Sequence, residues 1–256
     1  MGRAIRIALL LLILATVAQE AWLARSRATT WNDPLRVSIY PLNGDGSQAA
    51  ADYLRQLRLE TFEPIERFFA EESRRHGLDI HRPLRLTLAP PIAVLPPPPP
   101  KAASALDAIL WSLQMRWWAW RNSSGDGKPQ VRMYVLFFDA ERNPRLPHSV
   151  GLDRGMIGVV NAFATDAMAG SNNVVIAHEL LHTLGATDKY DPATNLPSYP
   201  LGYAEPERNP RHPQEFAEIM AGRIPRSPAQ ADIPESLDQT LIGAGTAAEI
   251  RWRKTP

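Results

Sequence analysis

The spacing of apolar and polar side chains predicts alternating strands and helices from residue 35 onward. Residues 35–43 alternate like a strand and run into the turn sequence NGDG. Within 48–75 apolar residues recur at helical intervals, which predicts one long amphipathic helix, bent at Pro64. A second strand is expected over 84–92. The prolines at 96–100 predict a stiff surface loop within one domain.

A further helix is predicted over 105–121, with apolar side chains on two opposite sides. One face carries six large residues: Leu106, Ile109, Leu110, Leu113, Trp117 and Trp120. The second stripe consists of Trp111, Met115 and Trp118. We expect the polyproline loop to cover this second stripe, and a membrane or partner contact is the alternative.

Two more strands and a helix complete this part of the chain. The continuous apolar run 131–139 predicts a buried central strand, and 155–163 predicts another. Ser171, Asn172 and Asn173 are N-cap candidates for the helix that follows. The order of elements predicts an α+β fold, in which a mixed twisted sheet packs on two long helices.

Composition narrows the chemistry that the chain can carry. Its 256 residues hold 28 Lys and Arg against 27 Asp and Glu, so no global field favours nucleic acid as a partner. Cysteine is absent, which excludes thiolate zinc sites, cysteine nucleophiles and disulfides. Any metal site must therefore use histidine nitrogen and carboxylate oxygen.

The N-terminal segment 1–30 is typical of an export signal. Two arginines precede the uncharged run 7–18, and Thr16-Val17-Ala18 offers a small-x-small cleavage site. Alternatively, the helical pattern extends through Leu23 as an uncleaved membrane anchor, with Trp22 at the interface. Both interpretations place the rest of the chain outside the cytoplasm, as a secreted, periplasmic or membrane-anchored protein.

The segment VVIAHELLHTLGATDKYD, residues 174–191, has the spacing of a metal site. His178 and His182 lie one helical turn apart, so both rings can direct a nitrogen at one zinc ion (Zn2+). Glu179 is rotated by about 100° from His178, which suits a general base acting on water in the ion's open position. The alternative is a pair of structural histidines, but an unpaired carboxylate among apolar neighbours is costly without a metal, proton or partner.

A catalytic zinc usually has three protein ligands, so a third must be found. Gly185 can end the helix at positive φ, and Asp188 then turns back toward the histidines. Three other residues are rival third ligands: Asp191, Glu205 and His212. A further alternative places the third ligand on a later helix, at Glu215 or Glu218.

The arrangement HExxHxxGxxD resembles the metzincin zinc metalloendopeptidases, and most closely their snapalysin-like branch, in which aspartate replaces the third histidine. The downstream segment EIMAGRIP supplies Met220 as the Met-turn candidate. The resemblance implies a metzincin-like zincin fold and one catalytic domain over 31–256. Its upper part would cover about 31–187, with the active-site helix, and its small, loop-rich lower part about 188–256, with a C-terminal helix near 246–252.

These observations lead to a hypothesis of zinc-dependent peptide-bond hydrolysis, with Glu179 as general base. We expect the strand 155–163 to be the sheet edge to which a substrate peptide adds. Three tyrosines are either oxyanion stabilisers or packing residues: Tyr190, Tyr199 and Tyr203. Four other histidines lack ligand spacing: His76, His81, His148 and His212. The alternative function is a catalytically silent zinc-binding envelope protein.

Overall fold

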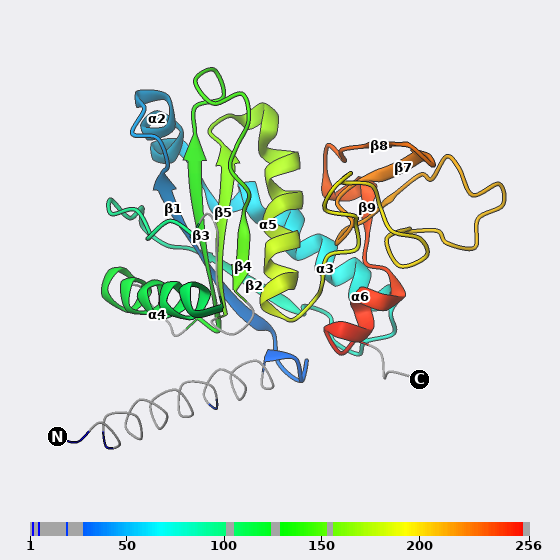
Figure 1. Cartoon of the computed structure of the whole chain (residues 1–256), viewed down its shortest axis with the longest axis horizontal. Coiled ribbons are helices and arrows are strands. Elements are labelled where there is room, and N and C mark those ends of the chain that lie inside the picture. The colour runs from blue at the N-terminus through cyan, green and yellow to red at the C-terminus, as the bar shows by residue number, and fades with distance from the viewer. Residues whose placement is uncertain are drawn as a thin grey trace.

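The computed structural model is an α+β protein in which five strands form one mixed sheet (Figure 1). Besides Gly2, Ile5 and Gln19, it describes residues 28–100, 105–123, 129–152 and 156–252. The sheet order is β2-β1-β3-β5-β4, and β4 alone in this sheet runs antiparallel to its neighbour. Its strands are β1 (Leu35–Asn43), β2 (Leu84–Leu88), β3 (Val131–Phe138), β4 (Val150–Leu152) and β5 (Ile157–Phe163).

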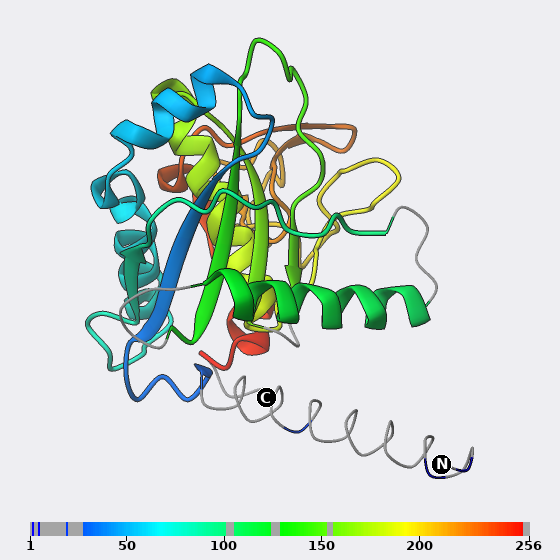
Figure 2. The same ribbon diagram turned by 90° about the vertical axis from the view of Figure 1, so that its left-hand side faces the viewer.

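Helices cover both faces of this sheet, so its central strands are apolar on both sides. Successive residues of β1 alternate, with Ile39 in one core cluster and Tyr40 in the other. The first cluster includes residues of α3 (Glu63–Arg75) and α5 (Ala169–Thr183), and the second includes residues of α4 (Ala105–Asn122). Figure 2 looks onto α4, which crosses the strands in front of the sheet, with α5 behind.

The prediction of one bent helix over 48–75 was wrong, because two separate helices occupy this stretch. The first, α2 (Gln48–Gln56), ends where Leu57 takes an extended ψ of 131°. A 3-10 turn, Leu59–Phe62, then leads into α3, which carries Pro64 in its first turn. Proline fits there because the first turn of a helix needs no backbone N–H bond. The break allows both Leu57 and Phe62 to be buried in the core.

Two other expectations are corrected at element ends. The strand expected over 84–92 stops at Leu88, since two prolines follow at 90 and 91, although Ile92 still forms an isolated bridge to Leu42. Helix α5 begins at Ala169, so Ser171, Asn172 and Asn173 lie inside its first turns and do not cap it. The side-chain amide of Asn172 instead accepts from Phe163 N and donates to Phe163 O, at 3.0 and 2.9 Å, which ties α5 to β5.

The sheet edge also differs from the prediction. The strand expected over 155–163 is observed as β5 from Ile157, and Gly155 lies outside the described residues. Within the described part of the chain β5 is internal, because β4 pairs along its outer side. The three residues of β4 are too few to produce a periodic signal in the sequence.

Helix α4 confirms the two-sided pattern predicted for it. Trp111, Met115 and Trp118 are at most 7% exposed, and Trp118 packs edge-on against Tyr134 of β3 at 4.9 Å. The Trp111 indole donates to Pro97 O at 3.0 Å, so the polyproline loop covers one end of this stripe and the sheet covers the rest. Among the residues that the structure describes, no helix combines the length and apolar character needed to cross a membrane. Most of segment 1–30 lies outside those residues.

The C-terminal part of the chain is rich in loops and lies beside α3 and α5 (Figure 1). Its short elements are β6 (Ala217–Glu218), β7 (Ile224–Ser227), β8 (Gln230–Asp232), β9 (Thr240–Leu241) and α6 (Ala244–Glu249). The helix expected near 246–252 is therefore α6, which ends earlier so that Trp252 packs against Phe69 and Trp31. The Trp31 indole donates to Ile250 O at 2.8 Å, which joins the start of the fold to its end.

Replacing Ile39 by Ala should destabilise the fold by about 2–5 kcal/mol, because Ile39 is fully buried at the centre of the sheet. Urea unfolding of the two proteins measures this difference. Leu59→Ala, at a side chain that is 39% exposed, is the control and should change stability by no more than about 0.5 kcal/mol. Equal effects of the two changes would contradict the placement of Ile39 in the core.

Candidate metal centre

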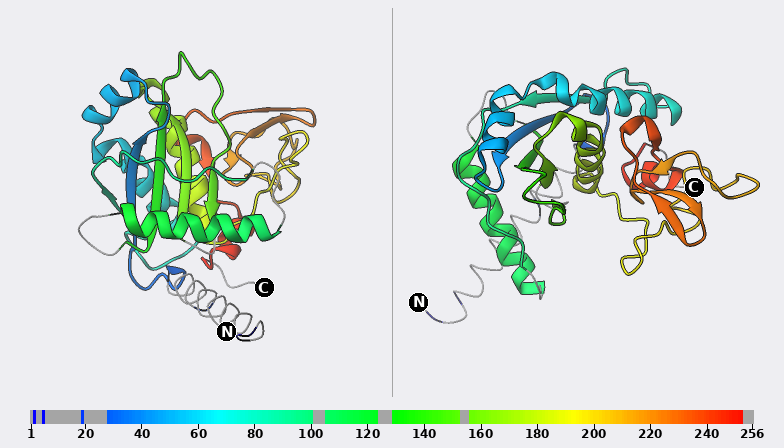
Figure 3. Two further views of the ribbon diagram at one scale, coloured as in Figure 1. Left: turned by 60° about the vertical axis from the view of Figure 1, so that its left-hand side comes forward. Right: turned by 90° about the horizontal axis from the view of Figure 1, so that it is seen from above.

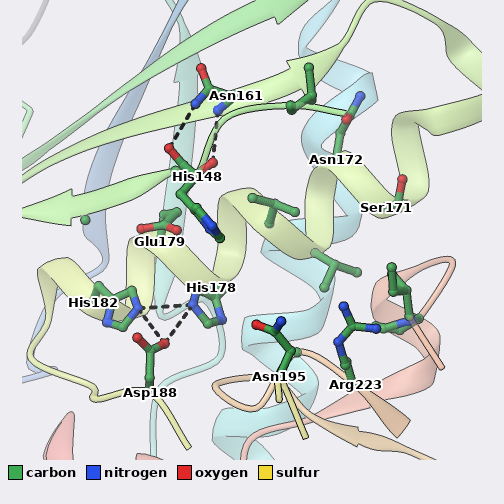
Figure 4. Close-up of a pocket in the computed structure, with 18 of the residues that line it drawn as sticks. His148, Asn161, Ser171, Asn172, His178, Glu179, His182, Asp188, Asn195 and Arg223 are labelled. Atoms are coloured by element: carbon green, nitrogen blue, oxygen red, sulfur yellow. Dashed lines mark hydrogen bonds and ion pairs between the residues drawn. The ribbon is translucent and has the colours of Figure 1, made fainter. Parts of the chain in front are cut away.

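The end of α5 brings the chain back over its own histidines. Gly185 has φ of +100°, and the helix closes with two bonds, from Gly185 N to His182 O and from Ala186 N to Leu181 O, both 3.0 Å. This pattern is a Schellman motif, for which glycine is favoured because it has no Cβ. Asp188 follows three residues after the glycine and is placed next to the two imidazole rings (Figure 4).

Three donor atoms converge at the middle of this site (Figure 4). The Nε2 atoms of His178 and His182 are 3.0 Å apart, and Asp188 Oδ1 lies 3.3 and 3.1 Å from them respectively. In the described part of the chain no other group of three histidine or carboxylate donors gathers closely enough to hold a metal ion. The sequence placed these three residues together as ligands, and the structure brings their donor atoms together.

The other nitrogen of each ring fixes which way its lone pair points. His178 Nδ1 lies 2.9 Å from Ile219 O, and His182 Nδ1 lies 2.8 Å from Ala186 O. A carbonyl oxygen only accepts, so both Nδ1 atoms carry a proton, and the tautomer that this selects has its lone pair on Nε2. Two lone pairs and a carboxylate then face one another, an arrangement that a shared cation or an added proton makes favourable.

The charges of the trio support one another. Burial opposes the charged form of His182, but the hydrogen bond to Asp188 and the nearby Glu179 charge outweigh it and raise the pKa of His182. Burial acts against ionisation of Asp188 as well, and its hydrogen bonds to the two histidines nevertheless lower its pKa well below the usual range. Asp188 is therefore an anion across the physiological range, as a ligand carboxylate must be.

Glu179 lies on the same helix, beside the trio but not in it. Its side chain is 6% exposed and its Oε2 atom has no hydrogen-bond partner in the described structure. Burial raises the pKa of Glu179, which the two histidines partly offset. Gly151 of β4 allows this close packing, since a Cβ there would lie 2.5 Å from His182 Cβ and 2.7 Å from Glu179 O.

A cleft of about 630 Å3 opens over these residues. One wall is β4 with the loop before it, another is α5, and the third comes from 188–195, 221–223 and 233–234. His148, a histidine to which the sequence analysis assigned no role, lies in the first wall, and Figure 4 shows its ring directed toward α5. The backbone carbonyl of His148 accepts a hydrogen bond from Asn161 Nδ2 at 3.1 Å. The spacing of residues in the sequence did not predict this contact.

Only one of the three tyrosines lies in the cleft. Tyr190 lines it, and burial together with the Asp188 charge raises the pKa of Tyr190. Tyr199 packs on Tyr203 at 5.4 Å, and Tyr203 Oη lies 3.0 Å from His212 Nε2. Tyr199 and Tyr203 thus have packing partners away from the trio.

Each rival third ligand has hydrogen-bond or ionic partners away from the trio. Asp191 Oδ1 accepts from the backbone of 193 and 194, and Glu205 and Glu215 both pair with Arg208. Glu218 lies in β6, not on a later helix, and is fully buried. Its carboxylate accepts from four donors: Met220 N, Ala221 N, Gly243 N and Thr246 Oγ1.

This Glu218 network shapes the turn that carries Met220. Met220 is fully buried and Gly222 closes the turn at φ of +67°. Ile219, the residue before Met220, supplies the carbonyl that orients His178. The turn therefore orients His178 through a backbone contact.

A second polar network holds the loop that carries Asp188. The Lys189 ammonium is buried and donates to Glu249 Oε2 at 2.7 Å and to Thr187 O at 2.9 Å. Glu249 also accepts from Thr187 N and Thr187 Oγ1, while Lys189 N donates to Met220 O at 3.0 Å. Asp188 is held between two residues anchored to α6, a link that sequence reasoning missed because 60 residues separate Lys189 from Glu249.

The sequence matches no protein-family model, and no curated protein is similar enough to the chain to count as a relative. Fold and geometry nevertheless define a class of site. It is a cluster of two nitrogens and one oxygen at the end of a helix, open to a cleft beside a sheet edge.

Changing Glu249 to Gln should reduce both stability and its pH dependence. Burial disfavours ionisation of Glu249, but its bonds from Lys189 and Thr187 outweigh burial and lower the pKa. A lowered folded-state pKa contributes stability above the unfolded value of about 4.3, and this contribution is lost as pH falls through the folded-state pKa. We expect Glu249→Gln to lose about 1–3 kcal/mol at pH 7, since Lys189 loses its ionic partner, and to lose less in acid.

Urea unfolding at pH 7 and pH 3 measures this effect. Glu235→Gln, at an exposed carboxylate, is the matched control and should change stability little at either pH. A loss for Glu249→Gln that is the same at both pH values would argue against the lowered pKa.

Proposed function

We propose that the protein is an exported zinc-dependent endopeptidase of the metzincin type. The observation that carries the proposal is the convergence of His178 Nε2, His182 Nε2 and Asp188 Oδ1 within 3.0 to 3.3 Å at the floor of an open cleft. The HExxHxxGxxD motif and the buried Met220 turn support the metzincin assignment. In this proposal 31–256 is one catalytic domain, and the cleft lies between its upper part, 31–187, and its lower part, 188–256.

The donor set fits Zn2+ in kind and in spacing. Imidazole nitrogen and carboxylate oxygen are both common zinc ligands, at about 2.0–2.1 Å. Tetrahedral ligands at that distance are about 3.3 Å from each other, close to the separations of the three donors. The hydrogen bonds from both Nδ1 atoms to carbonyls are the outer contacts that orient such ligands.

The chain's own residues then have separable roles in hydrolysis. A zinc ion held by the trio supplies Lewis acidity toward a carbonyl and a water molecule. Glu179, beside the trio, accepts a proton from water in the cleft and passes it to the departing amine. Its raised pKa suits both halves of this transfer, because burial makes the carboxylate hold a proton more readily until it can be donated. Tyr190 lines the same cleft and can donate to an oxyanion.

In this proposal the substrate peptide adds to β4, which is the outer strand, and not to β5, which is internal. Val150 and Gly151 of this outer strand line the cleft, so an extended peptide adding to the strand would pass over Glu179 and the trio. Backbone pairing of this kind tolerates many sequences, so the substrate is a peptide or protein, and nothing in the balanced charge favours nucleic acid. The signal-like segment 1–30 supports action outside the cytoplasm.

Replacing Asp188 by Ala should weaken zinc binding by about 100-fold or more, because it removes an anionic ligand, and even the loss of an outer contact to a ligand costs about 10–100-fold. Competition with a chromophoric chelator measures the affinity. Asp191→Ala, three residues along the same loop, is the control and should bind zinc as the unchanged protein does. If Asp188→Ala retains full zinc affinity, the third ligand is a different residue.

Replacing Glu179 by Gln should leave zinc content unchanged and reduce peptide cleavage by about 10²–10⁴-fold, the usual share of a general base. Glu215→Gln, at a carboxylate away from the trio, should cleave normally. Cleavage of quenched fluorescent peptides and metal analysis are measured on the same samples. Full zinc occupancy without cleavage, even in the unchanged protein, would favour the silent zinc-binding protein.

A further inference from the structure

The outer face of α4 is the largest group of exposed apolar side chains on any one element of the described structure. Trp120 is 79% exposed, Leu106 63% and Trp117 59%. Three more residues complete this face, which we call the outer α4 face: Ile109, Leu110 and Leu113. Contiguous apolar patches of this kind mark contacts with partners or membranes.

The exposed face is not needed to hold α4 in place. The opposite side of the helix already packs on the sheet through Met115, Trp118 and Ala119. A helix that is apolar all round is normally buried all round, whereas α4 is buried on one side only. The outer α4 face is therefore a candidate for contact with another surface.

We propose that the outer α4 face lies in the membrane–water interface, with the helix axis parallel to the bilayer. The first observation is the position of the N-terminal segment in the chain. The described fold begins at Ala28, at the same end of the molecule as α4 in Figures 1 and 2. In the sequence, the 27 residues before Ala28 contain the uncharged apolar run 7–18.

The second observation is the composition of the face. Two of its six residues are tryptophans, which favour the interface because the ring is apolar and the indole N–H is polar. Arg116 and Arg121 border the apolar arc, and the Arg121 guanidinium lies 5.6 Å from the centre of the Trp117 ring. Arginines at the rim of an apolar helix face can reach lipid phosphates.

A contact with lipid requires less of the face than a contact with a second copy of the chain does. The 18 residues of α4 make a helix about 27 Å long and about 10 Å wide. A stable contact with a second copy of the chain would need a matching surface that buries about 800 Å2 on each partner. A bilayer has no such lower limit, because each buried side chain adds to binding separately.

This orientation leaves the cleft in water. Helix α4 and α5 lie on opposite faces of the sheet (Figure 3), and the His178, His182 and Asp188 trio belongs to the α5 side. Membrane contact through α4 therefore does not cover the cleft. The proposal is independent of zinc binding and of hydrolysis.

The natural absence of cysteine allows a direct test on the full chain. A nitroxide label is attached at Leu113→Cys and, as a matched control, at Leu59→Cys on the opposite side of the sheet. The two leucines are 40% and 39% exposed, so neither change disturbs the core. With phosphatidylcholine and phosphatidylglycerol vesicles, the label at 113 should lose accessibility to a water-soluble nickel chelate and gain accessibility to oxygen, while the label at 59 stays aqueous.

A second variant separates burial in lipid from burial in protein. Adding Trp117→Glu should return the label at 113 to the aqueous value, because a charge in the face opposes immersion. Shielding of the label at 113 without vesicles, rising with protein concentration, would show a second copy and overturn the proposal. A label at 113 that remains accessible to nickel in vesicle-bound protein would also overturn it.

Discussion

The orientation of two imidazole rings by two backbone carbonyls is the interaction on which the site depends. His182 is held by Ala186 O, which is available because Gly185 ends α5 and turns the chain back. His178 is held by Ile219 O, which is available because Glu218 folds the next turn around its carboxylate. Each bond fixes a tautomer, so both lone pairs point to one place.

Polar networks hold the loops of the C-terminal part in place, whereas apolar packing holds the sheet and its helices together. Its strands are two to four residues long and cannot supply a core of their own. Glu218 accepts from four donors, and Lys189 with Glu249 joins the Asp188 loop to α6. Buried charges give little net stability, but one that loses its partner is costly, so such networks select one arrangement of the loops.

The periodicity of apolar residues predicted the helices and strands that bury one or two continuous faces. It did not predict features that depend on single tertiary contacts. Strands β1 and β3 and the two-sided pattern of α4 follow from apolar spacing alone. The break at Leu57 does not follow from spacing, because the helical pattern continues across it and the break is favoured by the burial of Leu57 and Phe62. Local spacing also placed Asp188 beside the histidines, since the Gly185 turn lies within the same segment. His148 and Glu249 come from distant segments and had no local signal.

The two core clusters make the two surfaces of the molecule independent. Side chains alternate along β1 and β3, so Met133 and Ile39 belong to the cluster under α5, while Tyr134 and Tyr40 belong to the cluster under α4. A rearrangement on the α4 side must pass through the hydrogen-bonded plane of the sheet to reach the histidines. In that plane β3 pairs along its length with both β1 and β5, so hydrogen bonds hold it on both sides. The chain can thus expose an apolar helix on one side while it holds the three donor atoms of the trio together on the other.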